Sequence, residues 1–199
     1  MTTLNDSNYG FERVSPEQFM KDFTNLINTT TANAFGIKEV IDLHTISANY
    51  DNIIKLPERS TKNSAGYDFF LPSIFTIKLN ESIINKPLII PTGIKCKLPN
   101  ECFLGLYPRS SFGIKKGIYL ANTVGIIDTD YYNNLDNEGH ILVALNARYA
   151  GDDNAFGITV INGGEKFVQG LIQPYLTFGD NVDVEREGGI GSTTLPSRD

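Results

Sequence analysis

The chain of 199 residues contains no tryptophan, only two cysteines and only two histidines. Cys96 and Cys102 are too few for the disulfide framework of a small secreted domain, so we expect both to be reduced residues of strands or of the core. Together with His44 and His140, these cysteines also lack the spacing of a zinc site. The sequence therefore predicts neither disulfide cross-links nor a structural zinc.

Long hydrophobic runs are missing as well. The longest apolar stretches, such as residues 87–91, are far shorter than the ~20 residues that a membrane-spanning helix needs. The N-terminus has no basic region followed by an apolar stretch, so no signal peptide is visible. We therefore expect a cytoplasmic protein without a membrane partner.

Positive charge is in short supply, with 17 Lys and Arg against 23 Asp and Glu and a net charge of −6. Binding of a polyanion depends on clustered Lys and Arg, so we expect no nucleic-acid partner. A small site can still be locally positive inside an acidic protein. The chain also lacks a Gly-Lys-Ser/Thr phosphate loop, a Gly-x-Ser-x-Gly nucleophile elbow and a dinucleotide-binding fingerprint.

From about residue 47 onward the chain consists of short apolar runs separated by Gly, Pro and Asn clusters. These runs cover residues 89–90, 93–98, 102–107, 118–120, 141–146, 158–161 and 167–173. Such spacing is typical of an all-β sandwich or barrel, and no long amphipathic helix interrupts it. The runs at 102–107 and 141–145 are apolar on both faces, which predicts central strands. We expect the β domain to cover residues 47–184.

Residues 1–46 have a different pattern and are expected to form an N-terminal extension. Ser15 as a cap, Pro16 in the first turn and Gln18 reaching back predict the start of a helix. One helical face then carries four apolar residues, Phe19, Phe23, Leu26 and Ile27. We expect a single helix or a helical hairpin, packed on the β domain or on a partner. Its role stays open between a stabilising appendage and a regulatory element that binds another protein.

Five short polar, glycine-rich segments occur in order over the last two-thirds of the chain. They cover residues 65–68, 108–113, 125–131, 164–169 and 186–193. The second segment offers the guanidinium of Arg109 and the hydroxyls of Ser110 and Ser111, which suit phosphate oxygens. The fifth combines glycines, hydroxyls and one arginine, a composition that favours phosphate binding. Together the segments supply the groups that a nucleoside triphosphate needs.

In this order the five segments resemble the motifs of the trimeric dUTP pyrophosphatases (dUTPases), over roughly residues 47–194. The resemblance implies an all-β, jelly-roll-like subunit and a homotrimer whose active sites are shared between chains. It also implies hydrolysis of dUTP to dUMP and pyrophosphate with Mg²⁺ as cofactor. Residues 185–199 would form a flexible C-terminal arm that closes over the bound nucleotide.

The resemblance assigns roles to individual residues. Asp128 would be the general base that activates the attacking water, and Asp68 would support the metal through bound water. Asn122 and the backbone from Gly125 to Tyr131, expected as a hairpin, would hold uracil. Tyr131 would also pack against the deoxyribose. The contacts to phosphate would come from Arg109, Ser110, Ser111, Gln169, Arg186, Ser192 and Thr193.

The chain departs from the family pattern at two places. Ile190 stands where the family usually has an aromatic residue that stacks on uracil, so apolar contact remains without stacking. Residues 133–138 lengthen the chain between Tyr131 and Gly139.

Two alternatives share the fold. A dCTP deaminase needs a glutamate in the strand after the hairpin, where this chain has Ala144, and this difference disfavours deamination. A regulatory, dUTP-sensing module would bind a protein partner through residues 1–46 or 133–138, and that role could coexist with catalysis.

Overall fold

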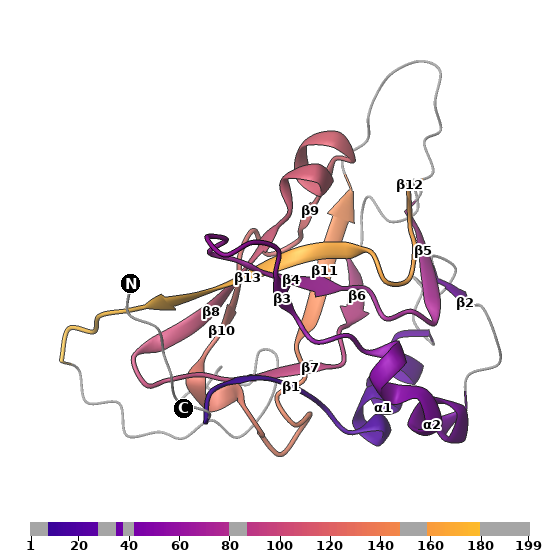
Figure 1. The fold of residues 1–199 in the computed structure, drawn as a ribbon, viewed down its shortest axis with the longest axis horizontal. Helices are drawn as coiled ribbons and strands as arrows, with labels where there is room; N and C mark the ends of the chain where they lie inside the picture. Colours follow the sequence, from indigo (N-terminus) through magenta and orange to yellow (C-terminus); the bar gives the residue numbers. More distant parts are fainter. Residues whose placement is uncertain (1–7, 28–34, 38–41, 80–86, 148–158, 180–199) are drawn as a thin grey trace, which may run out of the picture.

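The computed structural model describes residues 8–27, 35–37, 42–79, 87–147 and 159–179. Strands predominate in these ranges, and both α-helices belong to the N-terminal third (Figure 1). In chain order the elements are β1 Gly10–Arg13, α1 Pro16–Ile27, β2 Phe35–Ile37, α2 Leu43–Ile53, β3 Glu58–Arg59, β4 Tyr67–Phe70, β5 Phe75–Leu79, β6 Leu88–Pro91, β7 Ile94–Lys97, β8 Cys102–Pro108, β9 Ile118–Leu120, β10 Gly125–Ile127, β11 Leu142–Ala147, β12 Thr159–Ile161 and β13 Lys166–Pro174.

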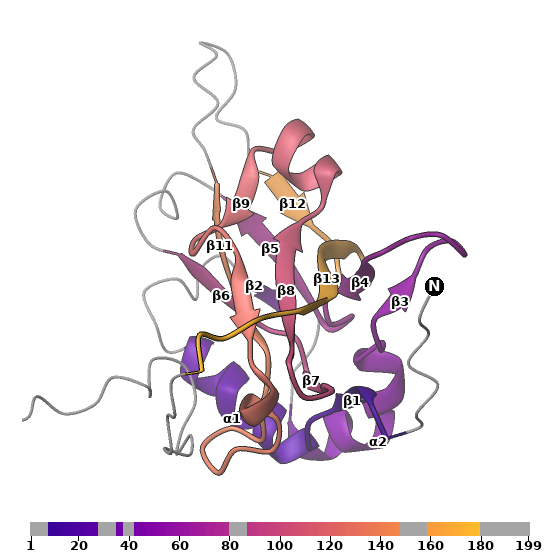
Figure 2. The same ribbon diagram turned by 90° about the vertical axis from the view of Figure 1, so that its left-hand side faces the viewer.

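All the strand pairs within the described ranges are antiparallel. The strand orders are β10-β8-β13-β4-β3, β6-β11-β9, β12-β5-β2 and β1-β7. β8 and β11 each have a neighbour on both sides, which confirms the prediction of central strands at 102–107 and 141–145. In the perpendicular view the three larger sheets stand above the β1–β7 pair and the helices α1 and α2 (Figure 2).

The sequence pattern does not predict β1 to β5. β4 illustrates the reason, because Asp68 interrupts an otherwise apolar run and removes the local signature of a strand. In the structure β4 is held by its pairing with β13, where Gln169 lies opposite Asp68 and Gly170 opposite Tyr67. Pairing with a strand about 100 residues away therefore overrides the weak local propensity.

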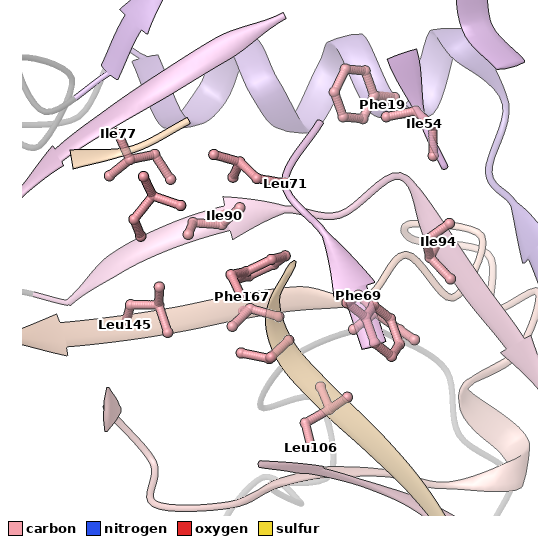
Figure 3. Packing of buried hydrophobic residues seen from close by; sticks show 14 of the residues in the cluster. Phe19, Ile54, Phe69, Leu71, Ile77, Ile90, Ile94, Leu106, Leu145 and Phe167 are labelled. Carbon is pink, nitrogen blue, oxygen red and sulfur yellow. The ribbon is translucent and has the colours of Figure 1, made fainter. Parts of the chain in front are cut away.

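One hydrophobic core extends from the sheets to the helices (Figure 3). Phe69 of β4 and Phe167 of β13 are completely buried, and so is Phe19 of α1. Phe19 stacks on Phe23 of the same helix with a centroid distance of 6.1 Å, and it meets Tyr50 of α2 edge-on at 6.0 Å. Burying a phenylalanine side chain contributes about 1.5–3 kcal/mol. The extension thus shares the core of the β domain.

The start of α1 confirms the predicted cap and corrects one part of it. Ser15 Oγ accepts a hydrogen bond from the Gln18 N–H at 3.1 Å, as expected of an N-cap. The Gln18 side chain does not reach back; it donates to Asp22 Oδ2 at 2.8 Å. Glu138 takes its place and accepts from the Ser15 N–H at 2.9 Å. The correction arises because Glu138 comes from a loop 123 residues away, which no local pattern reveals.

The described part of the extension is also joined to the sheets. β1 pairs with β7 and β2 pairs with β5. The expected boundary between residues 46 and 47 falls inside α2, which begins after Asp42, whose Oδ1 accepts from the Thr45 N–H at 2.7 Å. These contacts favour the stabilising role for the extension, whereas binding of a protein partner stays a prediction.

Both cysteines are free, as the sequence predicts. Cys96 is buried on β7, and burial raises the pKa of its thiol to about 12. Cys102 opens β8. Among the helices of the described residues, none has the length and apolar character needed to cross a membrane.

The Glu138 cap predicts a pH-dependent contribution to stability. Burial by itself raises the pKa of Glu138, but the hydrogen bonds from Ser15 and the charge of Lys95 outweigh it and lower the pKa below its ordinary 4.5. A lowered carboxyl pKa gives stability that is present above the unfolded-state pKa and is lost as pH falls through the folded-state pKa. Glu138→Gln should therefore reduce the unfolding free energy by about 1 kcal/mol near pH 7.

Urea denaturation at fixed protein concentration checks this expectation. The difference between wild type and Glu138→Gln should shrink as pH falls below about 4.5. A difference that stays constant between about pH 7 and pH 3.5 would contradict the assigned role of the carboxylate.

Candidate active site

Asp68 of β4 is the centre of a charged cluster. It is 6% exposed, and it accepts a hydrogen bond from Ser60 Oγ at 2.6 Å. Its carboxylate also pairs with Arg109 Nε and with Lys166 Nζ, each at 3.1 Å. Arg109 directly follows β8 and Lys166 begins β13, so three strands meet at this carboxylate.

The charges around Asp68 determine its protonation. Burial by itself raises the pKa of Asp68, but the hydrogen bonds from Ser60 and Lys166 and the charges of Arg109 and Lys166 hold the pKa below its ordinary value. Asp68 is therefore ionised at neutral pH. The side chain of Arg109 is 30% exposed, so its guanidinium remains accessible to a ligand. A planar fork of donors at this position suits a phosphate group.

Gln169 of β13 lies beside the same cluster. It stands opposite Asp68 in the β13–β4 register and opposite Tyr107 in the β13–β8 register. Its Nε2 is 3.5 Å from the carbonyl oxygen of Pro108. A Cβ added at Gly66 would lie 2.8 Å from Gln169 Oε1, so a side chain at this position would displace the Gln169 amide. The structure thus brings together Asp68, Arg109 and Gln169 from three of the predicted segments.

Ser110 and Ser111 begin a short π-helical segment, η3 Ser111–Lys115, with Ser110 as its N-cap directly after Arg109. The N–H groups of Phe112 and Gly113 both donate to the carbonyl oxygen of Arg109 at 2.9 Å, which fixes the backbone where the chain leaves β8. Ser110 is exposed and Ser111 is half-buried. The exposed Ser110, which follows Arg109 in the chain, fits the predicted contact with phosphate.

The residues predicted to hold uracil and the sugar form a second group. Asn122 is exposed in the turn between β9 and β10, where the Val124 N–H donates to its carbonyl oxygen at 2.7 Å. Asp128 follows β10 and is half-buried, and Tyr131 is 5% exposed. Gly125 is buried at the start of β10, opposite Leu106 of β8.

The expected hairpin at residues 125–131 is wrong. Gly125–Ile127 is the edge strand β10, and Thr129–Tyr131 forms a 3₁₀ turn. The chain reverses earlier, where the Thr123 N–H donates to the carbonyl oxygen of Leu120 at 3.0 Å. The difference arises because β10 finds its hydrogen-bonding partner in β8 and not in the residues that follow it.

The two groups lie far apart along β8. Ile127 is opposite Leu104, whereas Arg109 comes five residues after Leu104 in the same strand direction. At about 3.4 Å per residue, roughly 17 Å of strand separates these levels. Asp128 and Arg109 of one chain are therefore near opposite ends of β8.

Sequence reasoning did not assign two members of the cluster, Ser60 and Lys166. Lys166 lies in the fourth predicted segment, and a basic residue at the start of an apolar strand was an available signal. Ser60 carried no such signal, because its contact with Asp68 depends on the pairing of β3 with β4.

Some predictions cannot be placed in this structure. Arg186, Ile190, Ser192 and Thr193, like the whole expected arm at 185–199, lie outside the described residues. Within the described part of the chain, no three His, Cys, Asp or Glu side chains gather into a group that could hold a metal ion.

The comparisons with known proteins agree with one another. A family model described as dUTPase matches residues 52–147. A relative from Lactococcus lactis named deoxyuridine 5'-triphosphate nucleotidohydrolase is 41% identical over 143 residues, which cover 70% of this chain and 88% of the relative. The chain belongs to the dUTPase family. A relative of the same name from Hydrogenovibrio crunogenus is 34% identical over 151 residues, covering 70% of this chain and 87% of the relative.

Solved dUTPase structures show the same fold. The crystal structure of the Streptococcus mutans dUTPase matches with a TM-score of 0.53 and 32% identity, covering 74% of this chain and 99% of that chain. The dUTPase of Staphylococcus bacteriophage 80alpha matches in fold, with a TM-score of 0.51 and 20% identity over 79% of this chain and 93% of that chain. These matches and the antiparallel sheets confirm the expected all-β, jelly-roll-like fold.

Membership of the dUTPase family favours hydrolysis over the alternative of dCTP deamination. Ala144, at the position where a deaminase would need its glutamate, lies on β11 opposite Ile89. A methyl group cannot activate water, so β11 offers no carboxylate at this point.

The close contact between Gly66 and Gln169 predicts the effect of a single methyl group. Gly66→Ala should displace the Gln169 amide, because the new Cβ would stand 2.8 Å from Oε1. That oxygen ends a flexible side chain, so the unfolding free energy should change by less than about 1 kcal/mol. dUTPase activity should fall about tenfold or more, as in Gln169→Ala.

Steady-state kinetics of the two single variants and the double variant check this coupling. The double variant should be no less active than the less active of the two single variants, since both changes remove the Gln169 amide from the site. Additive losses would mean that Gly66 acts independently of Gln169.

Proposed function

We propose that the protein is a dUTP diphosphatase, which converts dUTP and water to dUMP and pyrophosphate. This activity supplies dUMP and keeps uracil out of DNA. The observation that carries the proposal is the cluster in which Asp68 pairs with Arg109 and Lys166. It joins an ionised carboxylate to two cations, in a chain 41% identical to a protein named for this activity.

The reaction needs no covalent intermediate. Asp128 takes a proton from water as the water oxygen attacks the α-phosphorus in line. The bond from the α-phosphorus to its bridging oxygen breaks, and its electron pair leaves with pyrophosphate. Arg109 and Gln169, with Arg186 from the arm, stabilise the negative charge that develops on the leaving group. Ser110, Ser111, Ser192 and Thr193 donate further hydrogen bonds to the phosphates.

Backbone N–H and C=O groups near Asn122 and Gly125 could select uracil over cytosine by hydrogen bonding. Uracil has a donor at N3 between two carbonyl acceptors, whereas cytosine presents a different pattern that would leave polar groups unpaired. Asn122 in the turn and the backbone from Gly125 onward offer an edge of this kind. Tyr131 packs against the deoxyribose and leaves no room for a 2′-hydroxyl. Ile190 of the arm adds apolar contact without stacking.

The residues of the charged cluster fit a substrate-bound Mg²⁺. This ion prefers oxygen ligands, and it commonly keeps several waters while substrate phosphates hold it. Asp68 is ionised beside the phosphate-binding cations, so it can accept hydrogen bonds from metal-bound waters. The bound ion would neutralise charge on the triphosphate and fix its conformation. Asp68 would orient those waters, while Arg109 would hold the phosphates.

A homotrimer with shared sites accounts for the separation along β8. The roughly 17 Å between the levels of Asp128 and Arg109 is too long for one α-phosphate to contact both residues in the same chain. Asp128 of one subunit and Arg109 of the next can instead meet at an interface. Exposed apolar side chains give neighbouring subunits a surface to cover, among them Ile126, Leu176 and Phe178 at 56%, 98% and 106% exposure.

Pyrophosphate release from dUTP, dCTP, dTTP and UTP tests the proposed activity. We expect cleavage that is selective for dUTP and that a chelator abolishes. Asp128→Ala should lower kcat about 10³-fold, within the range typical of a lost general base, and it should retain dUTP binding. Asp51→Ala, the same substitution at an acidic residue of α2 whose side chain is 84% exposed, is the matched control and should stay within about twofold of wild type.

Two outcomes would overturn the activity. Tight binding of dUTP without cleavage by the wild-type protein would favour the dUTP-sensing regulatory module. Neither binding nor cleavage, from a protein shown to be folded, would mean that the site residues are wrongly assigned.

Mixing two inactive variants tests the shared sites. Asp128→Ala and a chain that lacks residues 186–199 should each be inactive alone. Mixed trimers, confirmed by mass spectrometry, should recover part of the wild-type activity, because some sites then combine an intact Asp128 with an intact arm. No recovery in confirmed mixed trimers would contradict shared sites.

A further inference from the structure

Tyr131 is held at both ends by the loop that follows it. Its hydroxyl donates to the carbonyl oxygen of His140 at 2.9 Å and accepts from Asn137 Nδ2 at 2.8 Å. Its own carbonyl oxygen accepts from Asn134 Nδ2 at 2.8 Å. The ring is 5% exposed. The position of this side chain is therefore fixed by residues of the segment 133–138 and by His140.

The two asparagines form a connected network inside the loop. Asn134 and Asn137 are 8% and 7% exposed, and Asn134 Nδ2 also donates to Asn137 Oδ1 at 2.9 Å. Asn137 Oδ1 accepts in addition from the Gly139 N–H at 3.1 Å. Buried amides are costly when their donors and acceptors are unmet, and a satisfied network is rigid. The loop is thus a fixed support.

The end of the loop closes directly on Tyr131. Gly139 has φ +78°, and an added Cβ would lie 2.6 Å from the carbonyl oxygen of Tyr131. Both the left-handed conformation and the lack of space require glycine. The segment 133–138 therefore ends, at Gly139, against the backbone of Tyr131, the predicted sugar-binding residue.

Helix α1 supports this loop through His140, whose ring is completely buried. The Gly93 N–H donates to His140 Nε2 at 2.8 Å, so Nε2 is the acceptor and Nδ1 carries the proton. Nδ1 faces Asp22 Oδ2 of α1 at 2.6 Å. Burial by itself raises the pKa of Asp22, but the hydrogen bonds from His140 and Gln18 lower it overall, so the carboxylate is ionised. Asp22 thus fixes the ring of His140, and the carbonyl oxygen of His140 in turn accepts the hydrogen bond from the Tyr131 hydroxyl. In the view of Figure 2 the loop after β10 lies beside α1.

We propose that Asn137 and Asp22 are positioning residues for Tyr131, and that through them the 133–138 loop and α1 set the preference for deoxyribose over ribose. The inference rests on the proposed function, which places Tyr131 against the sugar. A ring excludes a 2′-hydroxyl only if it does not yield when the larger sugar enters. The contacts of Asn137 and of the Asp22–His140 pair prevent that movement.

This role predicts a change in selectivity, which differs from a loss of folded enzyme. A loosened ring admits UTP while dUTP still fits, so the ratio of kcat/KM for dUTP to kcat/KM for UTP falls. A purely structural defect lowers the amount of active enzyme, and it lowers kcat/KM for both substrates equally. The ratio therefore separates the two explanations.

The experiment measures this ratio in four variants. Asn137→Ala removes the donor to the Tyr131 hydroxyl, and the ratio should fall about tenfold. Asp22→Ala acts through His140 and should lower it about threefold. Tyr131→Phe removes only the hydroxyl, and Asn137 Nδ2 keeps its contact with the carbonyl oxygen of His140 at 3.3 Å, so this variant tests the proposal even if Asn137→Ala does not fold; its ratio should also fall about tenfold. Lys21→Ala is the matched control, because Lys21 neighbours Asp22 and its Nζ donates to the carbonyl oxygen of Asp136 at 3.1 Å, a contact outside the path through His140. It should keep the wild-type ratio within about twofold.

The outcomes distinguish this proposal from the activity on which it rests. If wild type cleaves dUTP selectively while Asn137→Ala and Tyr131→Phe keep its ratio, the positioning role is wrong and the activity stands. If Lys21→Ala lowers the ratio as much as Asp22→Ala, the effect is not specific to the path through His140 and the proposal fails. If wild type does not cleave dUTP, both fail together.

Discussion

The antiparallel position of β13 between β8 and β4 is the constraint on which the rest of the site depends. β13 pairs with β8 over seven residue pairs, and with β4 through Gln169 opposite Asp68. A shift of one residue would turn every side chain of the strand to the other face. Val168 is completely buried, and an added Cβ at Gly170, two residues along the same face, would lie 2.8 Å from Leu104 Cδ1, so core packing opposes such a shift. Burial of apolar side chains thereby sets the register that places Gln169 opposite Asp68, although neither polar side chain belongs to the hydrophobic core.

The charged cluster shows how a buried carboxylate is stabilised within the proposed phosphate site. An isolated buried Asp68 would be costly, and it would repel a triphosphate. Arg109 and Lys166 remove both problems, because each neutralises part of the carboxylate and offers donors toward a ligand. Under the proposed function, one cluster would combine phosphate binding with support of a metal's water shell.

The N-terminal extension and the 133–138 segment support each other in the structure. The segment 133–138 supplies Glu138, which caps α1, and α1 supplies Asp22, which holds His140 at the end of the loop. Each segment satisfies polar groups of the other, so the extension and the insert form one supporting unit. Through His140, which accepts a hydrogen bond from the Tyr131 hydroxyl, this unit also contacts the residue of the proposed sugar pocket.

The sequence by itself determined the features that depend on local patterns: the central strands at 102–107 and 141–145, the Ser15 cap, and the polar segments around Asp68 and Arg109. Only the tertiary structure decided what depends on register and on distant contacts. It replaced the expected hairpin at 125–131 with the edge strand β10 and a 3₁₀ turn, and it added Lys166 to the cluster and Glu138 to the cap. The physical reason is that apolar periodicity and capping act within a few residues, whereas a strand's partner is chosen by which long-range pairing buries the most core.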